Sequence, residues 1–338
     1  MARTRAIYGC AGLSLTEEEK SFFREARPWG FILFGRNVKD VAQVSELVRS
    51  LRETVEDDAA PVLIDQEGGR VARLKPPAWA KRPPAVRFAD LHNTAPEAAR
   101  EAVYLHARLI ANDLFQLGIT VDCFPVLDLP VEGSSDVIGD RALGRDAATI
   151  IDLGREAIDG LMEGGVLPVM KHIPGHGRAT ADSHLAVPRV AVSRAALSAT
   201  DFVPFRSLAH CPMAMTAHVI YEAIDPVRPA TISPRVVKEA IRGEIGFDGL
   251  LLSDDLSMNA LSGTLGQRTK AALFAGCDIA LHCNGNMDEM RAVAHEASSL
   301  DGLSLRRAET ALSHLTKPEA FDAPAAEAHL AELLGVAA

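Results

Sequence analysis

The feature that most constrains the fold of this 338-residue chain is a regular alternation of short apolar runs with amphipathic segments. Each run is short enough for a buried strand, and the segments between the runs carry apolar residues at helical spacing. Strands that alternate with helices are joined by crossover connections and therefore lie parallel. The apolar runs span residues 6–10, 30–34, 61–65, 119–124, 166–171, 213–218, 249–253 and 278–281.

A closed (β/α)8 barrel contains eight strand–helix repeats, the number found in this sequence. A doubly wound open sheet is the alternative. Residues able to do chemistry follow the carboxyl ends of most runs, among them Asp65, Asp128, Lys171, His218 and Asp254. Barrel enzymes build their sites from these ends around one axis, whereas an open sheet binds ligands at a single switch point. We therefore predict an α/β fold of the (β/α)8 TIM type, a single catalytic domain over residues 1–338 with covering helices at its carboxyl terminus.

Two local signals predict where helices begin. Thr16 followed by Glu19 is a capping box, and Ser233 followed by Pro234 is an N-cap with proline at the first helical position. We interpret residues 75–97, which are rich in proline and basic side chains, as one long loop after the third strand. No glycine-rich phosphate-binding motif follows a strand, so nucleotide binding has no support.

Charge and composition argue against several classes of partner. Lys and Arg number 35 against 45 Asp and Glu, and the net charge of −10 argues against nucleic acid, because phosphates need a basic surface. No apolar stretch approaches the roughly 18 residues of a membrane helix. The 5 cysteines are scattered without a C-x-x-C pair, which is typical of reduced thiols in a cytoplasmic protein. We expect a cytoplasmic monomer that acts on a small molecule.

A loop rich in glycine and proline, residues 171–180, holds the densest set of chemically useful side chains. It continues into Asp182 and His184, and a carboxylate near an imidazole can hold its tautomer and make it a proton shuttle near neutral pH. His172, His176 and His184 could also be the zinc ligands of a metal-assisted hydrolase. Their spacing differs from H-E-x-x-H and no cysteine pair accompanies them, so we expect no metal.

Two further motifs follow apolar strands. Asp254 ends the run Leu-Leu-Leu-Ser-Asp, and we interpret it as functional because a carboxylate in a barrel mouth is poorly hydrated unless something uses it. We interpret the adjacent Asp255 as the N-cap of the next helix. The segment from Asp65 to Arg73 contains acids and arginines that can form hydrogen bonds with sugar hydroxyls, and a glycine pair that lets the backbone turn sharply. An ion-paired turn would also explain this segment. The loop around Arg141 is equally compatible with a solvated turn.

Together these motifs resemble those of the β-N-acetylglucosaminidases of glycoside hydrolase family 3, the bacterial NagZ type. The matching motifs are Lys-His-x-Pro-Gly-His-Gly with its following Asp-x-His, Asp-Gln-Glu-Gly-Gly-Arg, and Ser-Asp-Asp-Leu-Ser-Met. The resemblance covers residues 30–278 and implies a (β/α)8-type barrel. Two positions depart from the family pattern, since Ile173 stands where Phe is usual and Asp140 stands where Glu precedes the loop arginine. Neither departure touches the expected chemistry.

The resemblance implies a retaining glycosidase whose nucleophile is Asp254 and whose acid/base residue is His184, assisted by Asp182. It implies sugar-binding roles for five further residues: Asp65, Arg73, Arg141, Lys171 and His172. The implied substrate is a terminal β-linked N-acetylglucosamine on a 1,6-anhydro-muropeptide, which is cleaved without a cofactor during cell-wall recycling in the cytoplasm.

A histidine acid/base leaves a second reaction open. Once the imidazole has donated its proton it is neutral and does not repel an anion, so phosphate could replace water and make the protein a phosphorylase. A sugar-binding barrel without catalysis is a further alternative, although such a binder has no need of a complete nucleophile and dyad.

Overall fold

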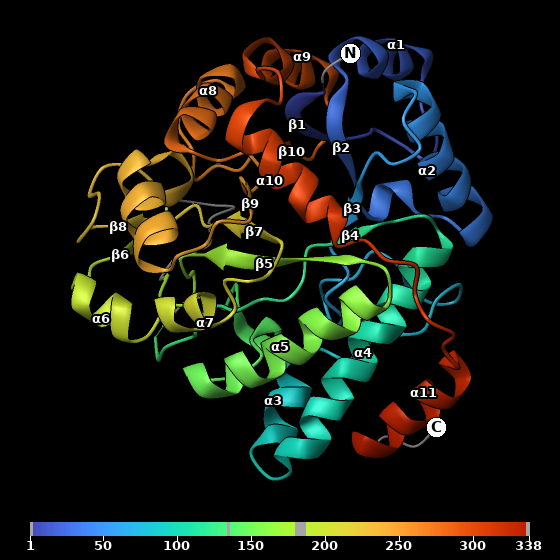
Figure 1. Cartoon of the computed structure of the whole chain (residues 1–338), viewed down its shortest axis with the longest axis vertical. Helices are drawn as coiled ribbons and strands as arrows, with labels where there is room; N and C mark the ends of the chain where they lie inside the picture. Colours follow the sequence, from blue (N-terminus) through green and yellow to red (C-terminus); the bar gives the residue numbers. More distant parts are fainter. Residues whose placement is uncertain (1–2, 134–135, 180–186, 336–338) are drawn as a thin grey trace.

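The computed structural model describes residues 3–133, 136–179 and 187–335, and within them parallel strands form a nearly closed barrel (Figure 1). The strand order is β10-β1-β2-β3-β4-β5-β7-β9, and a parallel bridge from Leu252 to Ile279 joins the two ends of the sheet. The predicted (β/α)8 fold is confirmed, and each of the eight apolar runs contributes one barrel strand. The strands are β1 (Thr4–Gly9), β2 (Pro28–Leu33), β3 (Val62–Ile64), β4 (Val121–Asp122), β5 (Leu167–Ile173), β7 (Met213–Thr216), β9 (Leu250–Leu252) and β10 (Ala280–His282).

The strands are apolar on both faces because both faces are buried. In β9, Leu250 and Leu252 belong to the cluster that fills the barrel interior, whereas Leu251 packs in the outer cluster beneath the helices. Met213 and Met215 of the neighbouring β7 pair in register with Leu250 and Leu252 and join the same interior cluster. In a parallel sheet that is covered on both sides, the sequence of each strand is a continuous apolar run, which is the pattern found in this chain.

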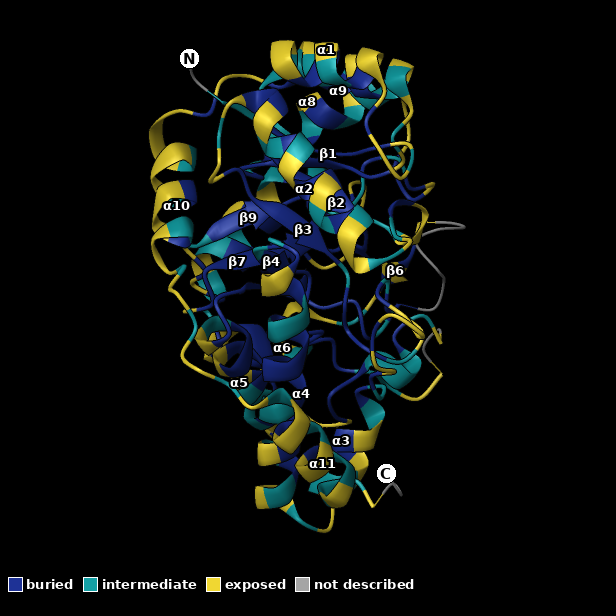
Figure 2. Ribbon diagram, turned by 90° about the vertical axis from the view of Figure 1, so that its right-hand side faces the viewer, coloured by how far each residue is buried: buried dark blue, intermediate teal, exposed yellow. Residues whose placement is uncertain are grey.

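The helices surround the barrel with their exposed faces outward (Figure 2). α1 begins at the predicted capping box, since Thr16 Oγ1 accepts from Glu19 N at 3.1 Å and Glu19 Oε2 accepts from Thr16 N at 2.8 Å. The α-helices are α1 (Glu17–Ala26), α2 (Val41–Val55), α3 (Val86–His92), α4 (Pro96–Gln116), α5 (Ala147–Glu163), α6 (Arg194–Ala199), α7 (Phe202–Ser207), α8 (Leu265–Ala275), α9 (Met287–Glu296), α10 (Gly302–Ser313) and α11 (Ala323–Leu333).

Two helical segments differ from the sequence-based expectation. The region 75–97 is not one loop, because it contains α3, whose Phe88 is fully buried against the His106 ring at a centroid distance of 4.9 Å. Ser233 does cap a helix, and its Oγ accepts from Val236 N at 3.2 Å. That helix is wound as a π-helix, η4 (Val236–Glu244), rather than as an α-helix.

The two ends of the barrel are covered differently. Ala308 and Ala311 of α10 belong to the interior cluster together with Trp29 of β2, so α10 closes the amino-terminal end. Figure 2 shows α10 on one side of the strands and the short strand β6 (Arg189–Val190), which pairs with β8 (Ile220–Tyr221), on the other. The carboxyl ends of the strands are therefore left for a site. Within the described ranges, no helix has both the length and the apolar composition needed to cross a membrane.

Candidate active site at the carboxyl ends of the barrel strands

The carboxyl ends of the barrel strands surround a cavity of about 180 Å³. Residues that are far apart in the sequence reach it from the ends of β3, β5 and β9 and from the loop after β4, which contains the 3₁₀ turn η2 (Gly139–Arg141). Six of the predicted site residues line this one cavity: Asp65, Arg73, Arg141, Lys171, His172 and Asp254. Asp182 and His184, the predicted dyad, lie outside the described residues.

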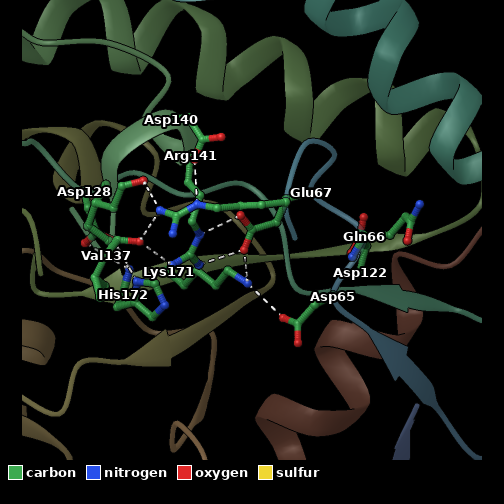
Figure 3. Close-up of polar contacts among 12 residues, drawn as sticks. Asp65, Gln66, Glu67, Asp122, Asp128, Val137, Asp140, Arg141, Lys171 and His172 are labelled. Atoms are coloured by element: carbon green, nitrogen blue, oxygen red, sulfur yellow. Dashed lines mark hydrogen bonds and ion pairs between the residues drawn. The ribbon is translucent and has the colours of Figure 1, made fainter. Parts of the chain in front are cut away.

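Lys171 lies at the centre of a buried charge network (Figure 3). Its Nζ is 2.9 Å from Asp65 Oδ1 and 2.7 Å from Glu67 Oε1. The side chain is only 2% exposed, and burial by itself lowers the pKa of a lysine. Asp65 and Glu67 outweigh burial and raise the pKa of Lys171 above its ordinary value. The ammonium group therefore stays charged and fixed in place.

Two arginines complete this network. Arg141 binds Glu67 through two parallel contacts, with Nε 2.8 Å from Oε2 and Nη2 2.8 Å from Oε1. Arg73 Nη2 donates to Asp65 Oδ2 at 2.9 Å. Burial raises the pKa of a carboxyl group, but these cations and Lys171 hold the pKa values of Asp65 and Glu67 below their ordinary range. Three cations thus face two carboxylates, and the network keeps one positive charge toward the cavity.

Asp128 orients two histidines from below the cavity. It is fully buried, and its Oδ2 lies 2.6 Å from His172 Nδ1. Its Oδ1 accepts from the backbone N–H of His176 at 2.6 Å and from that of His172 at 3.2 Å. With Nδ1 directed at Asp128, the Nε2 atom of His172 is left for a ligand. Burial lowers the pKa of His176 to about 4, so this second imidazole is neutral near pH 7.

Asp254 occupies the cavity wall at the end of β9. Its backbone N–H donates to Thr216 Oγ1 at 3.2 Å, and its Oδ1 accepts from Asp255 N at 2.8 Å. Among the described residues, no group donates a hydrogen bond to its Oδ2. Burial opposes ionisation, but the imidazoles of His218 and His172 outweigh it and hold the pKa of Asp254 below its ordinary value. Asp254 is thus an ionised carboxylate with one oxygen that accepts no hydrogen bond from the described part of the chain.

Asp255 has a structural role that differs from the predicted helix cap. Its Oδ1 accepts from Ser257 N at 3.0 Å and from Cys283 N at 3.2 Å, and its Oδ2 accepts from Ser257 Oγ at 2.6 Å. The next helix, α8, is capped by Thr264 instead. Asp255 therefore ties the end of β9 to the end of β10, and both of its oxygens are occupied.

Part of the cavity lining is apolar. It consists of Ile32, Phe34, Met215, Met258 and Leu281. The Phe34 ring also lies 5.1 Å from the guanidinium carbon of Arg73, a cation–π contact that holds the arginine at the rim. A cavity lined by both charged hydrogen-bonding groups and apolar side chains suits a sugar, whose hydroxyls donate and accept while its ring faces are apolar.

Sequence reasoning gave no catalytic or sugar-binding role to three residues of this site: Glu67, Asp128 and His176. A signal existed for Glu67, because two buried cations at 141 and 171 need more than one carboxylate partner and Glu67 follows Asp65 closely. For Asp128 the signal was its position at a strand end. Within residues 3–133, 136–179 and 187–335, no group of three or more His, Cys, Asp or Glu side chains is arranged to hold a metal ion.

Comparison with known proteins identifies the family of the chain. Residues 11–317 match the glycosyl hydrolase family 3 N terminal domain. A beta-hexosaminidase of Alkalilimnicola ehrlichii is 41% identical over 285 residues, which are 82% of this chain and 80% of that protein. A beta-hexosaminidase of Tolumonas auensis is 39% identical over 311 residues, which are 89% of this chain and 88% of that protein. The crystal structure of NagZ from Neisseria gonorrhoeae in complex with N-trifluoroacetyl-D-glucosamine superposes with a TM-score of 0.89 at 31% identity and covers 99% of both chains.

The chain therefore belongs to glycosyl hydrolase family 3, a class of glycosidases. Within that family it is a β-hexosaminidase of the NagZ type, and a small carbohydrate is its substrate.

Proposed function

We propose that the protein is a retaining exo-β-N-acetylglucosaminidase that removes terminal N-acetylglucosamine from 1,6-anhydro-muropeptides. Asp254 is the nucleophile, and His184 is the acid/base residue, assisted by Asp182. The observation that carries the proposal is the ionised Asp254 carboxylate, whose free Oδ2 shares one cavity with the Lys171 network. The family and the N-trifluoroacetyl-D-glucosamine bound by the Neisseria gonorrhoeae relative support a ligand of the N-acetylglucosamine class.

The sugar is held by charge-assisted hydrogen bonds. Asp65 and the Nε2 of His172 accept from sugar hydroxyls, since the proton of this imidazole is on Nδ1 toward Asp128, whereas Arg73, Arg141 and Lys171 donate to sugar oxygens. Because every one of these groups already has a partner, none has to reorganise when the sugar arrives. The cavity of about 180 Å³ is small for a ligand site and accommodates one sugar rather than a chain, which favours removal of terminal residues.

The reaction then proceeds in two displacements. Asp254 Oδ2 attacks the anomeric carbon while the bond to the aglycone oxygen breaks and His184 gives that oxygen its proton. In the second step His184 takes a proton from water, the water oxygen attacks the anomeric carbon, and the bond to Asp254 breaks. Asp182 keeps the imidazole in the tautomer that both steps need.

We place this reaction in the cytoplasm, as part of cell-wall recycling by a monomeric enzyme. Support comes from the cysteines, since Cys10, Cys123, Cys211, Cys277 and Cys283 are buried and unpaired, as is typical of a reducing compartment.

The test is release of p-nitrophenol from its β-N-acetylglucosaminide, with the β-glucoside as the comparison and with or without EDTA. We expect release from the first glycoside alone, unchanged by EDTA, and a loss of at least about 1,000-fold in kcat for Asp254→Asn. Mass spectrometry of enzyme trapped with a slow substrate should show one sugar on Asp254. Near wild-type turnover by Asp254→Asn would refute the nucleophile. Formation of a sugar phosphate in phosphate buffer would show a phosphorylase instead.

A further inference from the structure

A second cavity, of about 490 Å³, opens beside the active site. Its walls are the loops that follow the neighbouring parallel strands β2 and β3, so it lies at the same end of the barrel. Arg73 lines both cavities and is the wall between them. We call the second cavity the Lys75 pocket, after the residue at its rim.

The Lys75 pocket has an excess of positive charge. Lys39 and Lys75 line it and are exposed, and Asp40 is the single acid among its described lining residues. Asp40 Oδ1 already caps α2 by accepting from Gln43 N at 2.9 Å, and Oδ2 is 3.9 Å from Lys39 Nζ. Within the described part of the chain, no carboxylate oxygen lies within 4.0 Å of Lys75 Nζ. A cationic pocket beside the site is notable in a chain whose net charge is −10.

A third cavity has the opposite charge. It has a volume of about 530 Å³, lies between α3 and the loop after β4, and shares no described lining residue with the active-site cavity. Its charged lining residues are Arg145 and five acids: Asp90, Glu132, Asp136, Asp140 and Asp146. An anionic group that leaves the active-site cavity is therefore attracted to the Lys75 pocket and not to this acidic cavity.

The rest of the Lys75 pocket is apolar. Pro76, Pro77 and Trp79 line it, and the Trp79 side chain is buried while the prolines are exposed. A ligand that matches this lining has a carboxylate on a short arm that also presents apolar groups.

We propose that the Lys75 pocket binds the carboxylate-bearing peptide arm of the aglycone, with Lys39 and Lys75 pairing with its carboxylates. The inference rests on the proposed muropeptide substrate and assigns the residues that select it. The active-site cavity has room for one sugar, so the aglycone and its peptide must extend past the rim. The cavity beyond Arg73 is the adjoining space with the charge that the arm requires.

The test compares wild-type enzyme with the double variant K39Q/K75Q on three substrates. They are p-nitrophenyl β-N-acetylglucosaminide, neutral diacetylchitobiose, and N-acetylglucosaminyl-1,6-anhydro-muramic acid carrying an acidic peptide. Lys270→Gln is the matched control, because Lys270 is an exposed lysine on α8, away from both cavities.

We expect K39Q/K75Q to lower kcat/KM for the peptide substrate about fivefold at low salt, and raised salt to remove the difference. The two neutral substrates and the control variant should be unchanged. The inference would be overturned if K39Q/K75Q had the wild-type kcat/KM for the peptide substrate, or if its kcat/KM fell by the same factor on all three substrates. If the wild-type enzyme releases p-nitrophenol but leaves the peptide substrate intact, the proposed muropeptide function fails, and that result differs from every other outcome.

Discussion

Replacing Glu67 with glutamine is the sharpest test of the buried charge network. Glu67 is 3% exposed and contacts Lys171 at 2.7 Å and Arg141 at 2.8 Å through both oxygens. Glutamine keeps the shape of the side chain but removes its negative charge and puts an N–H donor against two cations. Breaking a buried ion pair by removal of one partner costs about 3–5 kcal/mol, because the remaining charges lie in a medium that solvates them poorly. We expect a loss of this size in the free energy of unfolding.

Urea denaturation followed by circular dichroism measures this loss. Glu53→Gln is the matched control, because Glu53 pairs with Arg49 on the outside of α2, where both side chains are more than half exposed. An exposed pair contributes little, so the control should unfold at the wild-type urea concentration. We also expect kcat/KM for the p-nitrophenyl substrate to fall about 100-fold, since Lys171 and Arg141 lose their fixed positions.

The stability difference should also depend on pH. The pKa of Glu67 is lowered in the folded protein, so its contribution is fully present above the ordinary glutamate pKa of about 4.3 and is lost as pH falls toward the folded pKa. The difference in the free energy of unfolding between wild type and Glu67→Gln should be largest above about pH 5 and should decrease as the pH falls below that value. A Glu67→Gln variant as stable as the Glu53→Gln control at pH 7 would refute the ion-pair account.

Two further outcomes follow from the site. Asp128→Asn removes the charged acceptor for His172 Nδ1, and because a hydrogen bond to a charged group is worth about 1.5–3 kcal/mol, kcat/KM should fall about 10- to 100-fold. The control is Asp152→Asn, which alters the outer pair with His92 and should leave kcat/KM unchanged. Equal effects of the two variants on kcat/KM would contradict the role of Asp128. Because the lowered pKa of Asp254 keeps its carboxylate ionised, the limb of kcat/KM that reports Asp254 should lie below the ordinary aspartate pKa of about 3.9. Substitution of Lys171 or His218 should move this limb to higher pH, and a limb that stays in place would show that the positive charge around Asp254 does not stabilise its carboxylate.

Some features of the site were within reach of sequence reasoning and others were not. Position after a strand singled out Asp254 and drew attention to residues 65, 73, 171 and 172, whereas the site roles of residues 65, 73, 141, 171 and 172 were implied by the resemblance of their motifs to those of family 3. Asp255 was misinterpreted as a helix cap, since an acid after a strand has the same local pattern whether it caps a helix or ties two strands. Its contact with Cys283 N spans 28 residues and is invisible in the local pattern.

The sequence by itself determined the barrel, through the periodicity of apolar residues and the capping residues. It also identified the groups at the barrel mouth, partly from their positions after strands and partly from the resemblance of short motifs to those of family 3. The tertiary structure alone decided which charge pairs with which. Glu67 joins Lys171 to Arg141, and Asp128 reaches His172 across 44 residues of sequence. Such pairs depend on the direction in which each strand end points its side chains, and that direction is set when the sheet closes around a common axis.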